Sequence, residues 1–137
     1  MIVADTNLVV ALLVPGPQAE TAERVLATDP DWCGPPLLFS ELRNVVAIYA
    51  RRATMAAGQC EAIVAEARRL VTCRVEDEAV DARLLRLALS SGCTAYDCEF
   101  AALAARLGAR LVTWDRQVLA AFPDLARSPE DFAGQAG

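Results

Sequence analysis

The sequence predicts an α/β fold, a three-layer α/β/α sandwich around a mostly parallel central sheet. Short apolar runs alternate with longer segments of helical periodicity along the whole chain. Two of these runs, Ile2–Ala4 and Leu111–Thr113, stop abruptly near an aspartate, as buried strands do at a polar turn. The 137 residues contain no internal repeat, low-complexity tract or linker, so we expect one domain spanning residues 1–137.

Four segments are predicted as strands because each is short, largely apolar and bounded by polar or turn-forming residues. In chain order they are Ile2–Ala4, Asp31–Cys33, Val71–Val75 and Leu111–Thr113. Helical segments separate them, which favours parallel pairing because parallel strands need a long crossover connection.

The helix ends are marked by residues that stop or cap helices. Pro15–Pro17 and Pro123 each end a helix, Gly92 and Gly108 fit C-terminal caps, and Glu76–Glu78 is predicted as an acidic first turn. The predicted helices are Leu8–Val14, Gln18–Ala27, Leu38–Arg52, Ala56–Leu70, Glu76–Ser90, Thr94–Leu107 and a segment from Asp115 to about Phe122. Ser128–Phe132 is expected to form a short acidic close, followed by frayed residues.

Two missing residue types restrict the chemistry. The chain has no histidine, and all 13 basic residues are arginine. Catalysis by Ser-His-Asp or Cys-His groups is therefore excluded, as are a P-loop and a Schiff base, both of which need lysine. An enzyme of this composition must work with carboxylates, hydroxyls and metal ions. The net charge of −5 neither supports nor forbids an RNA substrate, since a metal site would hold several of the acids.

The cysteines and the apolar runs indicate where the protein works. Five cysteines without a CxxC pair predict reduced, buried thiols rather than a disulfide framework or a zinc ribbon. No segment approaches the roughly 20 apolar residues of a membrane span, and Leu8–Val14 lacks the basic start of a secretory signal. We therefore expect a soluble cytoplasmic protein that makes no membrane contact.

Four acidic residues are candidates for one active site. Asp5 and Asp115 each follow an apolar strand, so both should point into the crevice beyond the carboxyl ends of the sheet if their strands are neighbours. The helix Leu38–Arg52 has a predicted apolar stripe formed by Leu38, Leu42, Val45 and Tyr49. Glu41 shares the face of this stripe, where a lone carboxylate would lose solvation. Asp97 opens a helix on the same side as two alanines, Ala101 and Ala104, which would let that helix approach its neighbours closely.

Each acid also has a simpler interpretation. Asp5, Asp97 and Asp115 all lie near helix starts, where aspartate is a favoured cap, and Thr94 with Asp97 fits a capping box. Glu41 could extend to the surface. Four acids converging on one crevice would nevertheless repel each other strongly, and one or two divalent cations would relieve that repulsion. Oxygen ligands suit Mg²⁺ or Mn²⁺ better than zinc, and such ions can hydrolyse a phosphodiester without histidine or lysine.

Four short motifs, in this order and spacing, resemble the PIN-domain nucleases, and among them the VapC-type toxins of bacterial toxin–antitoxin pairs. The resemblance covers nearly the whole chain and is carried by residues 2–7, 40–41, 95–104 and 111–115. It implies a PIN-like α/β/α fold and an endoribonuclease that depends on Mg²⁺ or Mn²⁺. The residues that would hold the metal and carry out catalysis are then Asp5, Glu41, Asp97 and Asp115.

The resemblance also implies supporting residues and partners. Thr6, Asn7 and Thr113 would orient the acids or the water, and Glu99 is a candidate for an outer-sphere role. The expected partners are an RNA substrate, a small cognate antitoxin of a type II system that covers the active site, and a second copy in a homodimer. The candidate arginines for substrate contact are Arg43, Arg51, Arg52 and Arg116.

Three other functions compete with the nuclease. A PIN fold used only for protein interaction would keep these elements without cleaving RNA. An aspartate-based phosphohydrolase would need a second aspartate where Asn7 stands, and it would also need a lysine. A phospho-receiver switch also requires a lysine near its last strand, and the chain has none.

Overall fold

A five-stranded, all-parallel sheet forms the centre of the protein in the computed structural model, which describes residues 1–53, 55–76 and 79–134. The strand order is β3-β2-β1-β4-β5. The strands are β1 (Ile2–Ala4), β2 (Trp32–Gly34), β3 (Val71–Cys73), β4 (Arg110–Val112) and β5 (Ala126–Arg127). The predicted α/β fold is therefore confirmed.

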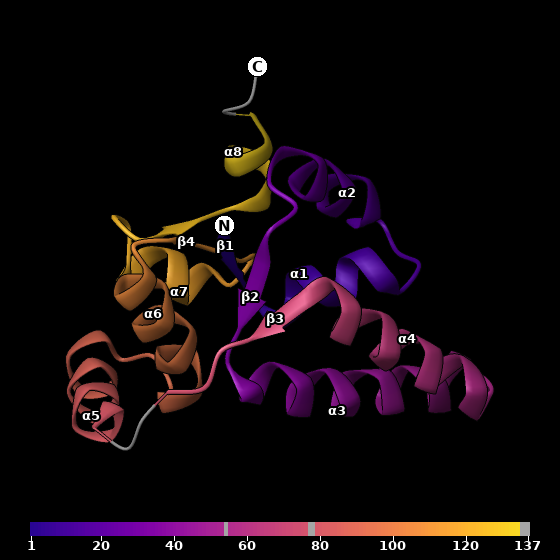
Figure 1. Cartoon of the computed structure of the whole chain (residues 1–137), viewed down its shortest axis with the longest axis horizontal. Helices are drawn as coiled ribbons and strands as arrows, with labels where there is room; N and C mark the ends of the chain where they lie inside the picture. The colour runs from indigo at the N-terminus through magenta and orange to yellow at the C-terminus, as the bar shows by residue number, and fades with distance from the viewer. Residues whose placement is uncertain (54, 77–78, 135–137) are drawn as a thin grey trace.

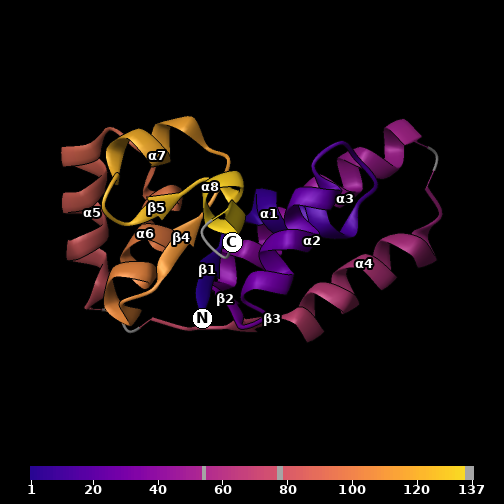
Figure 2. The ribbon, with the colours of Figure 1, turned by 90° about the horizontal axis from the view of Figure 1, so that it is seen from above.

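Helices flank the sheet on both sides (Figures 1 and 2). They are α1 (Thr6–Leu13), α2 (Ala19–Thr28), α3 (Pro36–Ala53), α4 (Ala57–Leu70), α5 (Val80–Ser91), α6 (Ala95–Leu107), α7 (Arg116–Ala121) and α8 (Pro129–Gly134). Helices α5 and α6 pack together on one side, whereas α1 to α4 lie on the other. Helices α3 and α4 run side by side as a hairpin that extends away from the sheet (Figure 1).

The core lies between the sheet and both helical layers. Val3 and Leu111 on the central strands are fully or almost fully buried, as are Leu8 of α1, Leu38 of α3 and Leu103 of α6. Small residues bring α6 close to β1 and β4, since Ala101 and Ala104 are buried there. Among the described residues, no helix combines the length and the apolar composition that crossing a membrane requires.

One predicted strand was too long, and one strand was missed. The predicted strand Val71–Val75 ends two residues early, at Cys73. The short strand β5 was missed because Ala126–Arg127 carries no apolar run. It forms through pairing with β4, in which the backbone N–H of Leu111 donates to the Leu125 carbonyl over 3.2 Å. A strand of this kind is set by its neighbour and not by its own sequence.

The helix predictions also need correction. Helix α1 begins at Thr6, directly after Asp5, instead of at Leu8. Helix α5 begins at Val80, and Glu76 lies before it, where its carboxylate pairs with Arg106 at 2.9 Å. The other two residues of the predicted acidic turn, and the frayed C-terminal residues 135–137, lie outside the described residues.

The apolar stripe of α3 was only half right. Leu38 and Leu42 are buried as predicted, but the next core residue is Val46, and Val45 is 36% exposed. Val45 and Tyr49 instead face a cavity on the same side of the helix as Glu41. Helix α3 therefore has one face buried in the core and another face that lines this cavity.

Candidate active site

Two aspartates meet where neighbouring strands end. Strands β1 and β4 pair in parallel, with Ala4 opposite Val112. Asp5 follows β1 directly, and its backbone N–H continues the pairing by donating to the Val112 carbonyl over 3.1 Å. Asp115 lies three residues beyond β4 and caps α7. The prediction that both follow neighbouring strands is confirmed, and the site lies at the edge where parallel sheets bind ligands.

The carboxylate of Asp5 is held by three donors. Its Oδ1 accepts from the backbone N–H of Thr6 at 2.6 Å, which also caps α1. Its Oδ2 accepts from the Asn7 amide at 3.0 Å and from the Thr113 hydroxyl. Three of the residues predicted to support the acids therefore surround Asp5 in the folded chain.

The Thr113 hydroxyl connects the first and last acids. Thr113 is fully buried, and its Oγ1 donates to Asp5 while accepting from the Asn7 amide at 3.0 Å and from the backbone N–H of Asp115 at 2.9 Å. A hydroxyl has one donor and two acceptor positions, so all of its capacity is used. The Asn7 carbonyl oxygen in turn accepts from the Trp114 backbone N–H at 3.3 Å. This network fixes the loop after β4 against the start of α1.

Asp115 and Asp97 both act as helix caps. Oδ1 of Asp115 accepts from the backbone N–H groups of Gln117 and Val118 at 2.8 and 3.0 Å. Oδ2 of Asp97 accepts from the Thr94 N–H and hydroxyl at 3.0 and 2.7 Å, and the Asp97 N–H donates back to that hydroxyl. Capping therefore holds each carboxylate by one oxygen. Within the described part of the chain, the other oxygen of each accepts no hydrogen bond.

Glu41 comes to the site from α3, which packs against α1. Its Oε1 accepts from the Thr6 hydroxyl at 2.9 Å. Thr6 therefore contacts two acids, because its N–H binds Asp5 and its side chain binds Glu41. One turn and two turns further along α3, Val45 and Tyr49 extend the same helix face.

The four acids line a single cavity of about 510 Å³. The other residues that line it belong to α1, to the loop between α1 and α2, and to α3. They are Thr6, Asn7, Val10, Ala11, Val14, Pro15, Gly16, Pro17, Gln18, Val45 and Tyr49. Sequence reasoning missed this apolar wall. Its only signal was the position of Val45 and Tyr49 on the Glu41 face of α3, which had been interpreted as core.

The acids influence each other electrostatically. Burial raises the pKa of Asp5 to about 6, against hydrogen bonds from Thr113 and Thr6 that lower it, and the charges of Glu41 and Asp97 raise it further. Burial also raises the pKa of Glu41, and Asp97 adds to that rise. Like charges therefore gather here, and a bound divalent cation would relieve their mutual repulsion.

Glu99 lies outside this cavity, but the charge of an acid in the cavity affects its pKa. Its pKa is raised by burial and then by the charge of Glu41. It lines a separate, smaller cavity of about 200 Å³ together with Glu76, Asp81 and five apolar residues. An outer-sphere role remains the furthest that its position supports.

The side chains that line the cavity are of the type that a hard divalent cation prefers, but their positions do not form a complete metal site. Carboxylate oxygens dominate the polar lining, and none of the five free cysteines lines the cavity. Among the described residues, however, no group of three acidic or thiol side chains is placed to hold a metal ion as it stands.

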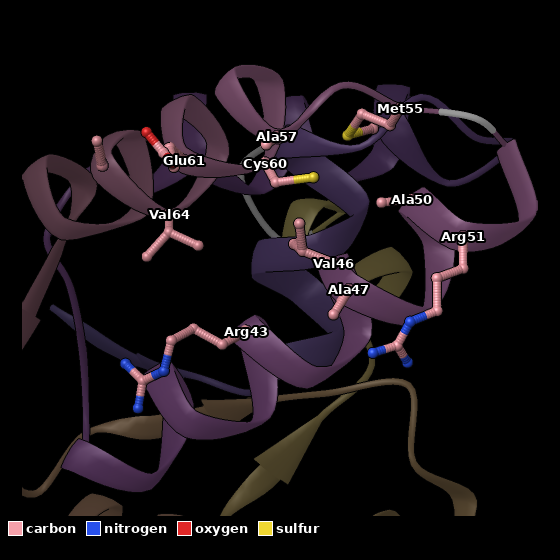
Figure 3. Close-up of a pocket in the computed structure, with 11 residues that line it drawn as sticks. Arg43, Val46, Ala47, Ala50, Arg51, Met55, Ala57, Cys60, Glu61 and Val64 are labelled. Carbon is pink, nitrogen blue, oxygen red and sulfur yellow. The ribbon is translucent and has the colours of Figure 1, made fainter.

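A second and larger cavity, about 940 Å³, lies between α3 and α4 and is mostly apolar. Figure 3 shows Val46 of α3 and Val64 of α4 pointing into this groove, with Arg43 and Arg51 along its α3 edge. These two candidate substrate arginines thus lie away from the acids. Arg52 is exposed, and Arg116 is exposed directly beside Asp115.

Comparison with known proteins agrees with this fold. Residues 2–125 match the PIN domain family. The chain belongs to this family of α/β domains. It is 30% identical over 128 residues to "Ribonuclease VapC3" of Pyrobaculum aerophilum, covering 90% of this chain and 96% of that protein.

Solved structures show the same fold. The crystal structure of PAE2754 from Pyrobaculum aerophilum superposes with a TM-score of 0.77 at 19% identity, over 98% of this chain and 88% of that one. A toxin–antitoxin complex from Klebsiella pneumoniae contains a chain with a TM-score of 0.73 at 16% identity, over 94% and 98% of the two chains. The predicted resemblance to PIN-domain, VapC-type proteins is confirmed.

Proposed function

We propose that this protein is an endoribonuclease that depends on Mg²⁺ or Mn²⁺ and is the toxin of a type II toxin–antitoxin system. The observation that carries the proposal is that Asp5, Glu41, Asp97 and Asp115, which are far apart in sequence, line one cavity at the carboxyl ends of parallel strands. The similarity to a relative named as a VapC ribonuclease supports the same reaction.

The four acids would divide the work. Asp5, Asp97 and Asp115 would hold the metal, and Glu41 would complete the site or help to position the attacking water. Asp5 is the best ordered of these, because three donors fix both of its oxygens. Asp97 and Asp115 are each fixed through one oxygen, which leaves the other for a cation.

When bound, the metal would activate a water molecule and stabilise the charge on the leaving oxygen of the phosphodiester. The chain's own residues prepare the site for this. Thr113 and Asn7 orient Asp5, and Thr6 holds Glu41 against the start of α1. Such supporting hydrogen bonds set the direction of metal ligands and raise their basicity.

The proposal includes two protein partners and a location. A small antitoxin would cover the acid cavity, as suggested by the similarity to a chain of a toxin–antitoxin complex. The family resemblance also suggests a homodimer. The protein would be cytoplasmic, where its RNA substrate is found. The five cysteines are all free thiols, which is typical of a reducing compartment.

The test is cleavage of a pool of cellular RNA by the antitoxin-free protein with Mg²⁺ or Mn²⁺, then with EDTA, beside Asp97→Asn and Asp5→Asn. We expect cutting that needs the metal and disappears in both variants while their folding is retained. These substitutions remove a charge with little change in shape. Cutting that survives in EDTA and in the variants would contradict the proposal. A protein that loads Mn²⁺ but cuts no RNA would favour an interaction-only PIN domain.

A further inference from the structure

The acid cavity has a second half that the cleavage chemistry does not use. Beyond the four acids, its wall is formed by Val10, Ala11 and Val14 of α1 and by Val45 and Tyr49 of α3. Tyr49 is the only aromatic side chain among the described residues that line it. The acids and this apolar wall share one continuous space.

Tyr49 lies at a useful distance from the acids. It follows Glu41 by eight residues on the same helix face, which places it about 12 Å along the helix axis. Val45, 36% exposed, covers the stretch between them. Tyr49 is half-buried, and within the described residues its hydroxyl makes no hydrogen bond. The ring therefore offers surface to the cavity, and its hydroxyl is not tied to a neighbouring group in the described part of the chain.

The charges around the cavity decide which group fits this wall. The charged side chains that line it are the four carboxylates, and no arginine of the described residues joins them. The carboxylates repel a phosphate unless a cation lies between them, so a phosphate would bind only beside a cation at the acids. The apolar wall instead favours a flat, neutral group. A nucleobase next to the scissile phosphate has this character, and aromatic rings bind bases of single strands by stacking.

We propose that the apolar half of the cavity is a subsite for a nucleobase of single-stranded RNA, and that Tyr49 stacks on this base. The inference rests on the proposed ribonuclease function. It assigns to Tyr49 the role of holding the strand next to the acids. A base in a duplex is already stacked on its neighbours, so the subsite selects unpaired RNA.

The test measures binding of two fluorescent probes in Ca²⁺, with the integrity of the RNA checked on a gel. One probe is a short single-stranded oligoadenylate, and the other is a chain of abasic ribose-phosphate units of equal length. We expect Tyr49→Ser to weaken oligoadenylate binding by about tenfold, and Tyr49→Phe to stay within about twofold of the unsubstituted protein, because the ring alone is needed. Tyr49→Ser should leave binding of the abasic chain unchanged.

Two controls separate stacking from a general defect. Tyr96, the other tyrosine of the chain, is 64% exposed on α6 and does not line the cavity, so Tyr96→Ser should bind oligoadenylate normally. Mn²⁺ affinity should be the same in Tyr49→Ser and the unsubstituted protein, because Tyr49 contacts none of the acids through a hydrogen bond, and both proteins should be folded at the temperature of the assay.

The outcomes distinguish the subsite from the function on which it rests. An unsubstituted protein that loads Mn²⁺ but neither binds nor cuts any RNA overturns the ribonuclease, and the subsite with it. Normal RNA binding that Tyr49→Ser leaves intact overturns the subsite alone. Equal weakening toward both probes also overturns it, since the loss would then be independent of the base.

Discussion

Helix α3 separates two cavities that differ in size, chemistry and position. The acid cavity, about 510 Å³, contains four carboxylates and lies where β1 and β4 end. The groove between α3 and α4 is larger, about 940 Å³, yet Glu61 is the only carboxylate among the described residues that line it (Figure 3). The larger cavity is therefore the one with fewer charged groups that could bind a polar ligand. Converging polar groups at the ends of parallel strands mark the acid cavity as the candidate site.

The two cavities are lined by two different faces of the same helix. Glu41, Val45 and Tyr49 face the acids, whereas Val46 and Ala50 face the groove. Apolar residues four positions apart form a stripe whether they face the core or a cavity. The sequence pattern alone therefore cannot tell which of the two a given helix face meets. Paired substitutions on the two faces therefore test which cavity is functional.

The largest expected difference is between two glutamates. Glu41→Gln should lower RNA cleavage by more than about a hundredfold, since losing an acid of the site should exceed the 10- to 100-fold typical of a supporting partner. Glu61→Gln, the same change in the groove, should leave the rate within about twofold. Single-turnover cleavage of one labelled RNA measures both. Equal rates for the two variants would move the chemistry away from the acid cavity.

Metal binding should stabilise the fold through the acid cavity alone. Mn²⁺ at about a hundred times its dissociation constant should add about 2.7 kcal/mol to the free energy of unfolding, and EDTA should remove this gain. The stabilisation should disappear in Asp97→Asn and persist in Glu61→Gln. Denaturant unfolding with and without the metal measures it. An equal gain in both variants would place the cation elsewhere.

Without metal, the acid cavity should make stability fall as the pH rises. The pKa of Asp5 is about 6 in the folded chain and lower when unfolded, so between these values the folded state binds more protons. Stability is therefore lost as the pH rises through the folded value, by roughly 1 kcal/mol between pH 5 and pH 7.

Asp5→Asn is the control for this dependence. The asparagine does not titrate, so the variant should lose less stability than the unsubstituted protein over the same pH range. Chemical denaturation in EDTA at the two pH values gives the comparison. Identical slopes would mean that Asp5 keeps its charge at both pH values.

The smallest expected effect distinguishes two arginines. Arg116 is exposed beside Asp115, whereas Arg43 lines the groove and donates to the Ser40 hydroxyl at 3.1 Å. Arg116→Ala should weaken RNA binding severalfold and reduce its salt dependence by about one phosphate contact. Arg43→Ala should change neither quantity. A larger effect from Arg43 would indicate that RNA crosses the groove.

Helix capping and a position in the acid cavity are compatible for the same aspartates. Asp5, Asp97 and Asp115 each cap a helix, as the simpler interpretation required, and each also lines the acid cavity. The reason is geometric. In a parallel sheet the helices begin just beyond the strand ends, so residues that cap them lie at the edge where ligands bind.

The sequence by itself determined what is local. The alternation of apolar runs and helices gave the parallel α/β fold, and the absence of histidine and lysine limited the chemistry to acids and metals. Asp5 and Asp115 could be chosen because each follows a strand, Glu41 because it interrupts an apolar face, and Asp97 because it opens a helix beside small residues. These features depend on residues within a few positions of each other, where periodicity and capping rules act.

Only the tertiary structure decided what depends on distant neighbours. It formed β5 by pairing with β4, directed Val45 and Tyr49 to the cavity instead of the core, and separated Arg43 from Arg116. It also joined Thr113 to Asp5 across more than a hundred residues. Hydrogen bonds and burial of this kind arise from packing between elements, and local propensity does not encode which face of an amphipathic helix meets which partner.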